Sequence, residues 1–449
     1  MKTLTAVATF GVGLLALACS MSPIVVPTTN AKPPSPASEA ATGFDNNSNG
    51  VVDDATHQAD QAKFDEFEAI ADGLGPLFNA QSCRECHQNP VSGGVSQVME
   101  LRVGHKGKDG QFQNPDIPIN HGSEVIKGRS LVNSRAICPN ADFPTTEIQE
   151  RVPESETIRA FRTSLNLLGD GFVEAVDDST LIAIAKNQCK RDRGKICGLV
   201  LYVPVVESPG VTRVGRFGWK SQQASLLSFA GDAYLNEMGI TNALFPDEVT
   251  KLCNTVAEPN DKPGADGLAG IDHFARFMRA SKAPARDARQ AGTPAAKQGE
   301  ALFAKVGCDL CHVPTLTTAA PGTALNGGKF TVPDALGNKV IHPYSDFLLH
   351  DVGTGDGIVM AMTEHYGKNM YQVKWKDLSL DSYRSTANRM RTAPLWGVRL
   401  QMMLMHDGAS LTFRDAILRH RGEASTVTEH FERLSHADQE AMIEFLRSL

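Results

Sequence analysis

Two identical Cys-x-x-Cys-His motifs are the clearest chemical signal in this chain. They occupy residues 83–87 and 308–312, and their cysteines and histidines are Cys83, Cys86, His87, Cys308, Cys311 and His312. Two thiols at this spacing lie one helical turn apart and can form thioethers with both vinyl groups of one haem, while the adjacent histidine supplies an axial nitrogen to the iron. A single zinc site made by both cysteine pairs is the alternative, but it leaves the histidines unexplained. The motifs therefore predict two covalently bound c-type haems.

The residues before the motifs repeat as well. Leu77–Phe78 and Leu302–Phe303 each stand the same distance ahead of a first cysteine, and each pair is expected to end a short helix that packs on its own haem. This repeat predicts a mainly α fold with two cytochrome c-like domains, long loops and small β insertions. The first haem domain is predicted at residues 44–282, a linker rich in Pro, Gly and Ala at 283–298, and the second haem domain at 299–449.

The N-terminus has the pattern of an export signal. Lys2 precedes an apolar run that ends in Ala-Leu-Ala directly before Cys19, so residues 1–18 are predicted to be a signal peptide. The run is shorter than the ~20 residues of a bilayer-spanning helix. Cys19 resembles a bacterial lipoprotein acylation site, with cleavage to a soluble form as the alternative. Residues 19–43 are predicted to be a flexible tether. The expected location is the periplasm or cell envelope of a bacterium, with a lipid anchor at Cys19.

Composition excludes several classes of protein. The 449 residues carry a formal charge of -7, which gives no basic footprint for nucleic acid. A hydrophobic share of 41% is that of a folded, non-membrane chain rather than of a disordered or multi-span protein. Four cysteines belong neither to the motifs nor to the predicted processing site at Cys19, and in an oxidising compartment they can pair in three ways. We favour Cys189–Cys197 with Cys138–Cys253.

Hydrophobic periodicity locates the elements that must position these groups. Helices are expected at residues 221–238, 411–421 and 435–449, and a strand followed by a turn is expected at 199–210. Ser435 and Asp438 have the spacing of a capping box. The apolar stripe of the 411–421 helix includes His420, which is therefore expected to point inward.

Six segments of the chain resemble the di-haem oxidoreductase, or thiol oxidoreductase-like, family: residues 72–79, 216–220, 348–351, 391–397, 406–408 and 416–424. That family is similar to the bacterial di-haem cytochrome c peroxidases and to the di-haem enzyme that matures methylamine dehydrogenase. The resemblance implies an oxidoreductase with one peroxide-reactive haem and one electron-transfer haem. It also implies a redox protein as electron donor or acceptor, and peroxide or another small oxidant as substrate. A pure electron-transfer protein and an oxidase that modifies a partner protein are the alternatives.

The sixth ligands of the irons are less constrained than the proximal ones. Candidates for the second haem are His342, His350, His365, His406, His420, Met403 and Met405. We favour His420, which faces inward and lies in the region where the peroxidase relatives place this ligand; a core histidine is the alternative. His350 and His406 are expected to be structural or to contact a propionate. The first haem needs an open or displaceable face, for which His105 and His121 are candidate ligands in a resting state.

Two further residues are candidates for catalysis. Glu174 stands between apolar residues, where an unpaired carboxylate is costly, and it could move the proton during O–O cleavage. A buried Glu174 paired with Arg162 or with a backbone amide is the alternative. Trp219 is one of only three tryptophans and is a candidate electron relay between the haems, with simple packing as the alternative.

A possible calcium loop precedes the first motif. Asp45, Asn47, Asn49 and Gly50 have the spacing of oxygen ligands around a sharp turn, but Thr56 replaces the bidentate glutamate expected at the twelfth position. A turn held by Asx hydrogen bonds is the favoured interpretation.

Overall fold

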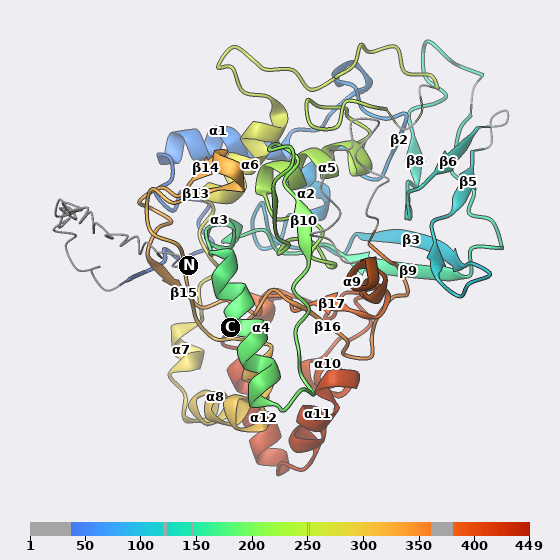
Figure 1. The fold of residues 1–449 in the computed structure, drawn as a ribbon. Coiled ribbons are helices and arrows are strands. Elements are labelled where there is room, and N and C mark those ends of the chain that lie inside the picture. The colour runs from blue at the N-terminus through green and yellow to red at the C-terminus, as the bar shows by residue number, and fades with distance from the viewer. Residues whose placement is uncertain (1–36, 120–123, 146, 249, 251, 361–379) are drawn as a thin grey trace, which may run out of the picture. The chain divides into compact units, whose positions relative to one another are not determined.

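A computed structural model describes residues 37–119, 124–145, 147–248, 250, 252–360 and 380–449 (Figure 1). The predicted signal peptide 1–18, Cys19, His121 and His365 lie outside these residues. Within them, no helix is both long and apolar enough to cross a bilayer.

The helices and strands are distributed along the whole described chain. The helices are α1 Asp54–Asp65, α2 Cys83–Cys86, α3 Asp170–Glu174, α4 Asp178–Arg191, α5 Leu226–Met238, α6 Gly270–Ala280, α7 Ala288–Ala291, α8 Pro294–Val306, α9 Leu380–Ser385, α10 Phe413–Leu418, α11 Ser425–Glu432 and α12 His436–Leu446. The strands are β1 Ser38–Glu39, β2 Leu77–Phe78, β3 Met99–Lys106, β4 Phe112–Gln113, β5 Asp116–Pro118, β6 Val125–Lys127, β7 Leu131–Val132, β8 Arg135–Ala136, β9 Ile158–Thr163, β10 Tyr202–Pro204, β11 Thr212–Val214, β12 Leu316–Thr317, β13 Ala324–Leu325, β14 Phe330–Thr331, β15 Lys339–Ile341, β16 Leu349–His350 and β17 Met390–Arg391.

The expected mainly α fold class is wrong. The protein is 32% helical and 16% strand, and its strands form many small sheets. Much of the strand content lies between the first motif and α3, where β3 pairs antiparallel with β9, β7 and β4. Apolar and polar residues alternate along β3, with Glu100 and Arg102 on one face and Leu101 and Val103 on the other. This period of two is a strand signal that the sequence analysis missed.

Three packed helices support the first motif. α1 packs against α6, and α6 packs against α5. α1 begins at an N-cap, Asp53, whose carboxylate accepts a hydrogen bond from Thr56 N at 2.7 Å. α6 buries one apolar face that includes Phe274 and Phe277, and Phe277 lies against Phe64 of α1. This packing fixes the wall behind His87, whose ring lies 6.3 Å from that of Phe64.

A second helical layer, α8 packed against α12, supports the second motif (Figure 1). Their approach is close enough that a Cβ on Gly299 would meet the Ala441 carbonyl oxygen at 1.9 Å, so glycine is required there. As predicted, Ser435 caps α12 by accepting from Asp438 N at 3.2 Å. The predicted helices 221–238 and 411–421 are present as the shorter α5 and α10. The predicted strand and turn form the hairpin β10–β11.

One local expectation about the flanks of the motifs fails. Leu302 and Phe303 lie in α8 as expected, but Leu77 and Phe78 form β2, which pairs with β8. On α1, Phe64 takes the place that Phe303 has on α8, because the two rings lie 6.3 and 6.2 Å from His87 and His312. The structural repeat is therefore a phenylalanine ring beside each motif histidine, and not the Leu-Phe pair of the sequence.

Residues on both sides of the predicted linker are joined at several points. β1 pairs with β15, and Ala283 bridges to Thr42. α7 and the start of α8 lie within residues 283–298, and Asp287 N donates to the Ser448 carbonyl at 2.8 Å. Residues 37–43, the end of the predicted tether, are thus part of the fold. The domain boundaries stay a prediction.

The favoured disulfide pairing is confirmed. Cys138 pairs with Cys253 and Cys189 pairs with Cys197, with Cα–Cα distances of 6.2 and 4.5 Å. The four motif cysteines are not part of a disulfide.

Candidate haem sites

The first motif lies on the single helical turn α2. Ser82 caps this turn by accepting from Arg84 N at 3.1 Å, and Cys83 and Cys86 are at its two ends. His87 follows directly, and its Nδ1 lies 3.2 Å from the Gly94 carbonyl oxygen. A ring nitrogen that donates to this carbonyl leaves Nε2 as the lone-pair nitrogen, which is the form that binds a metal.

The second motif repeats this arrangement with a different local structure. α8 ends at Gly307, which adopts a left-handed conformation with φ of 101°, and the chain then makes a 3-10 turn over Cys308–Leu310. Nδ1 of His312 lies 3.0 Å from the Tyr344 carbonyl oxygen. Both motifs therefore present two free thiols and one oriented imidazole.

Burial sets the protonation of these groups. Burial lowers the pKa of His87 to about 4, and burial, with a smaller contribution from the neighbouring His420, lowers the pKa of His312 to about 4. Burial also raises the pKa of Cys86 and of Cys308 to about 12. Neutral imidazoles and neutral thiols beside a cavity are the forms that fit a haem with two thioether links and a histidine ligand.

Cys86 and His87 line a first cavity of about 200 Å³. Its opposite wall is unexpectedly polar, and its charged side chains come from β3, β9, α5 and the loop before α5: Glu100, Arg102, Arg162, Lys220, Asp232 and Glu237. Of these residues, only Arg162 was predicted to lie in a site, and there only as a partner for Glu174. The alternation along β3 was the available signal.

The acids of this wall outnumber its available cations. Arg102 binds Glu100 through two nitrogens at 2.6 and 3.0 Å. Arg162 and Lys220 both bind Asp356, at 2.7 and 2.8 Å. Within the described part of the chain, this leaves Glu237, which accepts from Asn79 at 2.9 Å, without a cation of its own.

Glu237 is consequently the carboxyl group that holds a proton. Burial and then the charge of Glu100 raise the pKa of Glu237 to about 8. Burial opposes ionisation of Glu100 too, but Arg102 and Arg162 hold its pKa below the usual value. At neutral pH the pair therefore contains one carboxylate, Glu100, and one protonated acid, Glu237.

The second cavity, also about 200 Å³, is lined by the second motif and is mainly apolar. His420 of the predicted 411–421 helix lines it, together with Cys308, Cys311 and His312. Nδ1 of His420 lies 2.8 Å from the Ala416 carbonyl oxygen, which leaves Nε2 for the cavity. Burial lowers the pKa of His420, so its imidazole is neutral.

The other candidate sixth ligands differ in whether they line the cavity beside their motif. His342 is exposed, lies 3.0 Å from Glu39 and does not line the second cavity, and Met403 lines a neighbouring hollow instead. Met405 and His406 line the second cavity and so remain alternatives to His420. Near the first motif, Nδ1 of His105 binds Glu156 at 2.9 Å, and the residue does not line the first cavity.

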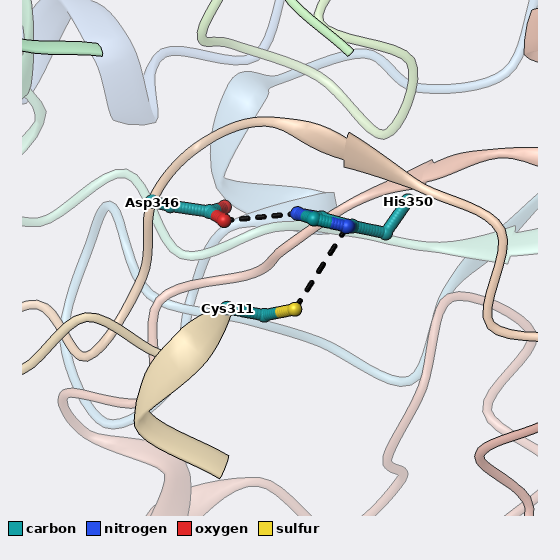
Figure 2. A group of neighbouring side chains, drawn as sticks. All are labelled: Cys311, Asp346 and His350. Atoms are coloured by element: carbon teal, nitrogen blue, oxygen red, sulfur yellow. Dashed lines mark hydrogen bonds and ion pairs between the residues drawn. The ribbon is translucent and has the colours of Figure 1, made fainter. Parts of the chain in front are cut away.

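His350 lies against the second motif but is held by carboxylates (Figure 2). Its Nε2 lies 2.9 Å from Asp346, its Nδ1 lies 2.9 Å from Glu423, and Nδ1 is 3.8 Å from Cys311 Sγ. Burial would lower the pKa of His350, but Asp346 raises it well above the ordinary value. Cys311, Asp346 and His350 are close enough to hold a metal ion, but Cys311 belongs to the haem motif and both nitrogens of His350 already face carboxylates.

Trp219 lies between the two cavities. Its side chain lines both of them, and its Nε1 donates to the Thr163 carbonyl at 2.8 Å. Its ring also lies 6.0 Å from that of His406 in an edge-to-face arrangement. The position is the one that a relay requires, and the relay role stays a prediction.

Glu174 is fully buried away from the motif cavities. It binds Arg279 at 2.7 Å and accepts from Leu226 N at 3.0 Å and from Asn326 at 2.9 Å. It lines neither cavity. Burial would raise its pKa, but Arg279 and these hydrogen bonds hold the pKa below the ordinary value. These contacts match the alternative interpretation of Glu174 as a buried, paired carboxylate. Its ion-pair partner is Arg279 and not the expected Arg162.

The possible calcium loop forms Asx turns. Asn47 N donates to Asp45 at 3.1 Å, and Val51 N donates to Asn49 at 3.1 Å. The Asp45 carboxylate is bound by Lys282 at 2.8 Å. These contacts match the favoured interpretation, and calcium binding stays untested.

Residues 138–449 match the model of a protein family described as "Di-haem oxidoreductase, putative peroxidase". The chain belongs to the di-haem oxidoreductase family. The matched region contains the second motif, Trp219 and His420, whereas the first motif precedes it. Membership in this family implies two haems and oxidoreductase activity. No curated protein matches the chain.

Three solved structures share a low degree of similarity with the protein. Hydrazine synthase of Kuenenia stuttgartiensis is 13% identical, with 98% of this chain and 100% of that chain covered and a TM-score of 0.38. The di-haem peroxidase BthA from Burkholderia thailandensis is 14% identical, with 53% and 66% covered and a TM-score of 0.30. A MauG-like protein associated with microbial copper homeostasis is 17% identical, with 40% and 52% covered and a TM-score of 0.24. These scores are too low to support an argument about function.

Proposed function

We propose that the protein is an exported c-type di-haem peroxidase that reduces peroxide with electrons from a redox protein. Cys83 and Cys86 would hold one haem and Cys308 and Cys311 the other, with His87 and His312 as proximal ligands. The predicted signal peptide supports export. Export in turn fits c-type haem attachment, which is completed outside the cytoplasm. Lipid anchoring through Cys19 is part of the proposal. Calcium binding is not part of it.

The contrast between the two cavities carries this proposal. The second cavity places a second imidazole, His420, in its lining, so two protein nitrogens are available there. Among the described residues, the lining of the first cavity contains no second histidine but contains ionisable groups, including Glu237. A closed site suits electron transfer, whereas an open site with a proton donor suits peroxide.

Haem iron, when bound, supplies the redox change that splits the O–O bond; the chain must supply protons, electrons and a sheltered pocket. Reduction of one peroxide to two waters consumes two electrons and two protons. The protonated carboxyl of Glu237 can donate one of these protons in the first cavity, and solvent water would supply the other and reprotonate Glu237. We assign this role to Glu237 instead of Glu174, because Glu174 has no access to either cavity. Trp219, which borders both cavities, would conduct the electrons.

One observation favours the alternative of a pure electron-transfer protein. Met360 lines the first cavity, and its thioether is a potential sixth ligand. If this ligand were bound, both irons would be closed to peroxide.

Selective removal of the first haem tests the proposal. The Cys83→Ser/Cys86→Ser variant should retain the spectrum of the second haem but lose peroxide-dependent oxidation of a one-electron donor. The retained spectrum shows that the variant has folded. Undiminished peroxide turnover in that variant would assign the reaction to the other site.

A further inference from the structure

A surface hollow of about 700 Å³ reaches the wall of the second cavity. β9, the loop at residues 353–356 and the end of α10 form it, and its lining includes Arg159, Phe161, Thr354, His406, Arg419 and Arg421. Thr354 and His406 also line the second cavity. The hollow is therefore separated from the predicted second haem site only by side chains that the two spaces share.

The rim of this hollow is positively charged. Arg159 donates to the Glu156 and Pro153 carbonyls at 3.1 and 3.2 Å, and Arg421 donates to the His420 carbonyl at 3.0 Å. Among the residues that the structure describes, neither guanidinium has a carboxylate within ion-pair distance.

The acids of the hollow do not cancel this charge. Asp407 is bound by Arg419 at 3.0 Å, and Asp356 is bound by Arg162 and Lys220 in the interior. The surplus positive charge of Arg159 and Arg421 is notable because the chain as a whole carries a formal charge of -7. A local field of this sign attracts an anionic surface.

The hollow also presents an aromatic contact. Arg159 and Phe161 are two residues apart on β9, so both point to the outer face of the strand, and Phe161 is 54% exposed. An exposed aromatic side chain beside unpaired arginines is the composition of the energetic centre of many protein–protein interfaces.

The hollow is connected to both predicted haem sites through aromatic side chains. His406 lines the hollow and the second cavity, and its ring lies 6.0 Å from the ring of Trp219. Trp219 in turn lines the first cavity. An electron that enters at the hollow thus meets the second site first.

We propose that this arginine-rimmed hollow docks an acidic redox protein that passes electrons to the second haem site. The inference rests on the proposed function and adds the place and charge of its electron donor. In each encounter the partner's redox centre is oxidised by one electron and the protein is reduced by one, with no bond made or broken. The partner is expected to carry carboxylates around its exposed redox centre.

Electron transfer to the oxidised holoprotein from a small acidic blue copper protein and from a basic cytochrome c, both reduced, tests this proposal. Stopped-flow rates should favour the acidic donor and should fall as ionic strength rises. Arg159→Glu should lower the second-order rate with the acidic donor on the order of tenfold at low ionic strength. Arg289→Glu makes the same charge change at an exposed position of α7 outside the hollow and should leave the rate unchanged.

Equal rates for Arg159→Glu and Arg289→Glu would overturn the docking site, as would a preference of the unmodified protein for the basic donor. Unchanged haem spectra in Arg159→Glu would show that its fold is intact. Peroxide consumption is measured separately. If peroxide does not react but the charge dependence persists, the peroxidase proposal fails and the docking site stands.

Discussion

At the scale of single residues, both motif histidines and His420 have a neutral imidazole with one nitrogen bound to a backbone carbonyl. His87, His312 and His420 all have this arrangement, with Nδ1 to carbonyl oxygen distances of 3.2, 3.0 and 2.8 Å. Each carbonyl fixes the tautomer and orients the ring before a metal is bound. The two proximal ligands and the favoured sixth ligand are thus prepared in the same way.

His420→Ala tests the ligand assignment. If Nε2 of His420 is the sixth ligand, the variant should convert the second haem from low spin to high spin, which the visible and magnetic circular dichroism spectra report. Met405→Ala serves as the matched control, because Met405 lines the same cavity. An unchanged second haem in His420→Ala, with conversion in Met405→Ala, would transfer the role to the methionine.

Glu237→Gln tests the proton donor. Because the pKa of Glu237 is raised to about 8, its carboxyl carries a proton below that pH and loses it as the pH rises. The rate of reaction with peroxide should therefore decline as the pH rises through about 8 in the unmodified protein. The variant should react roughly a hundredfold more slowly at pH 7 and should lack this decline.

Glu429→Gln, on the exposed surface of α11, is the control for that experiment. It should keep both the rate and the pH profile of the unmodified protein. A decline near pH 8 that persists in Glu237→Gln would assign the titration to another group.

At the scale of elements, Glu174 joins three helices. It lies on α3, accepts from the first backbone N–H of α5, and binds Arg279 of α6. Glu174→Gln leaves Arg279 buried without its counter-charge and should lower the free energy of unfolding by about 3–5 kcal/mol, measured by chemical denaturation followed by circular dichroism.

The pH dependence of this contribution has a definite sign. The folded protein holds the pKa of Glu174 below its ordinary value of 4.5. Its stabilising contribution is therefore complete above that value and is lost as the pH falls through the lowered pKa. The difference in stability between the protein and Glu174→Gln should shrink in acid; a difference that stays constant down to pH 2 would contradict the assignment.

The elements also show what sequence could and could not predict. Spacing and periodicity predicted the motif residues, α12 with its Ser435 cap and the inward position of His420. For the disulfides, three pairings were open, and the structure confirms the favoured one. The sheet around β3 was missed because Glu100 and Arg102 alternate with apolar residues over only one strand. For Glu174 the sequence left the catalytic and the structural role open, because burial alone does not distinguish them and its partner, Arg279, is distant in sequence.

At the scale of the whole molecule, two similar motifs are placed in unlike cavities that share one tryptophan. The apolar second cavity brings His312 and His420 together, whereas the first cavity opposes His87 with a wall of charged groups. Trp219 borders both. This asymmetry, rather than either motif alone, is the basis of our proposal that electrons enter at the second site and reduce peroxide at the first.

The electron paramagnetic resonance spectrum of the ferric holoprotein tests this asymmetry most directly. The account predicts one high-spin centre, from the first site, and one low-spin centre, from the second, with the high-spin signal lost when peroxide is added. Two low-spin centres that do not respond to peroxide would contradict it and would establish the protein as an electron carrier.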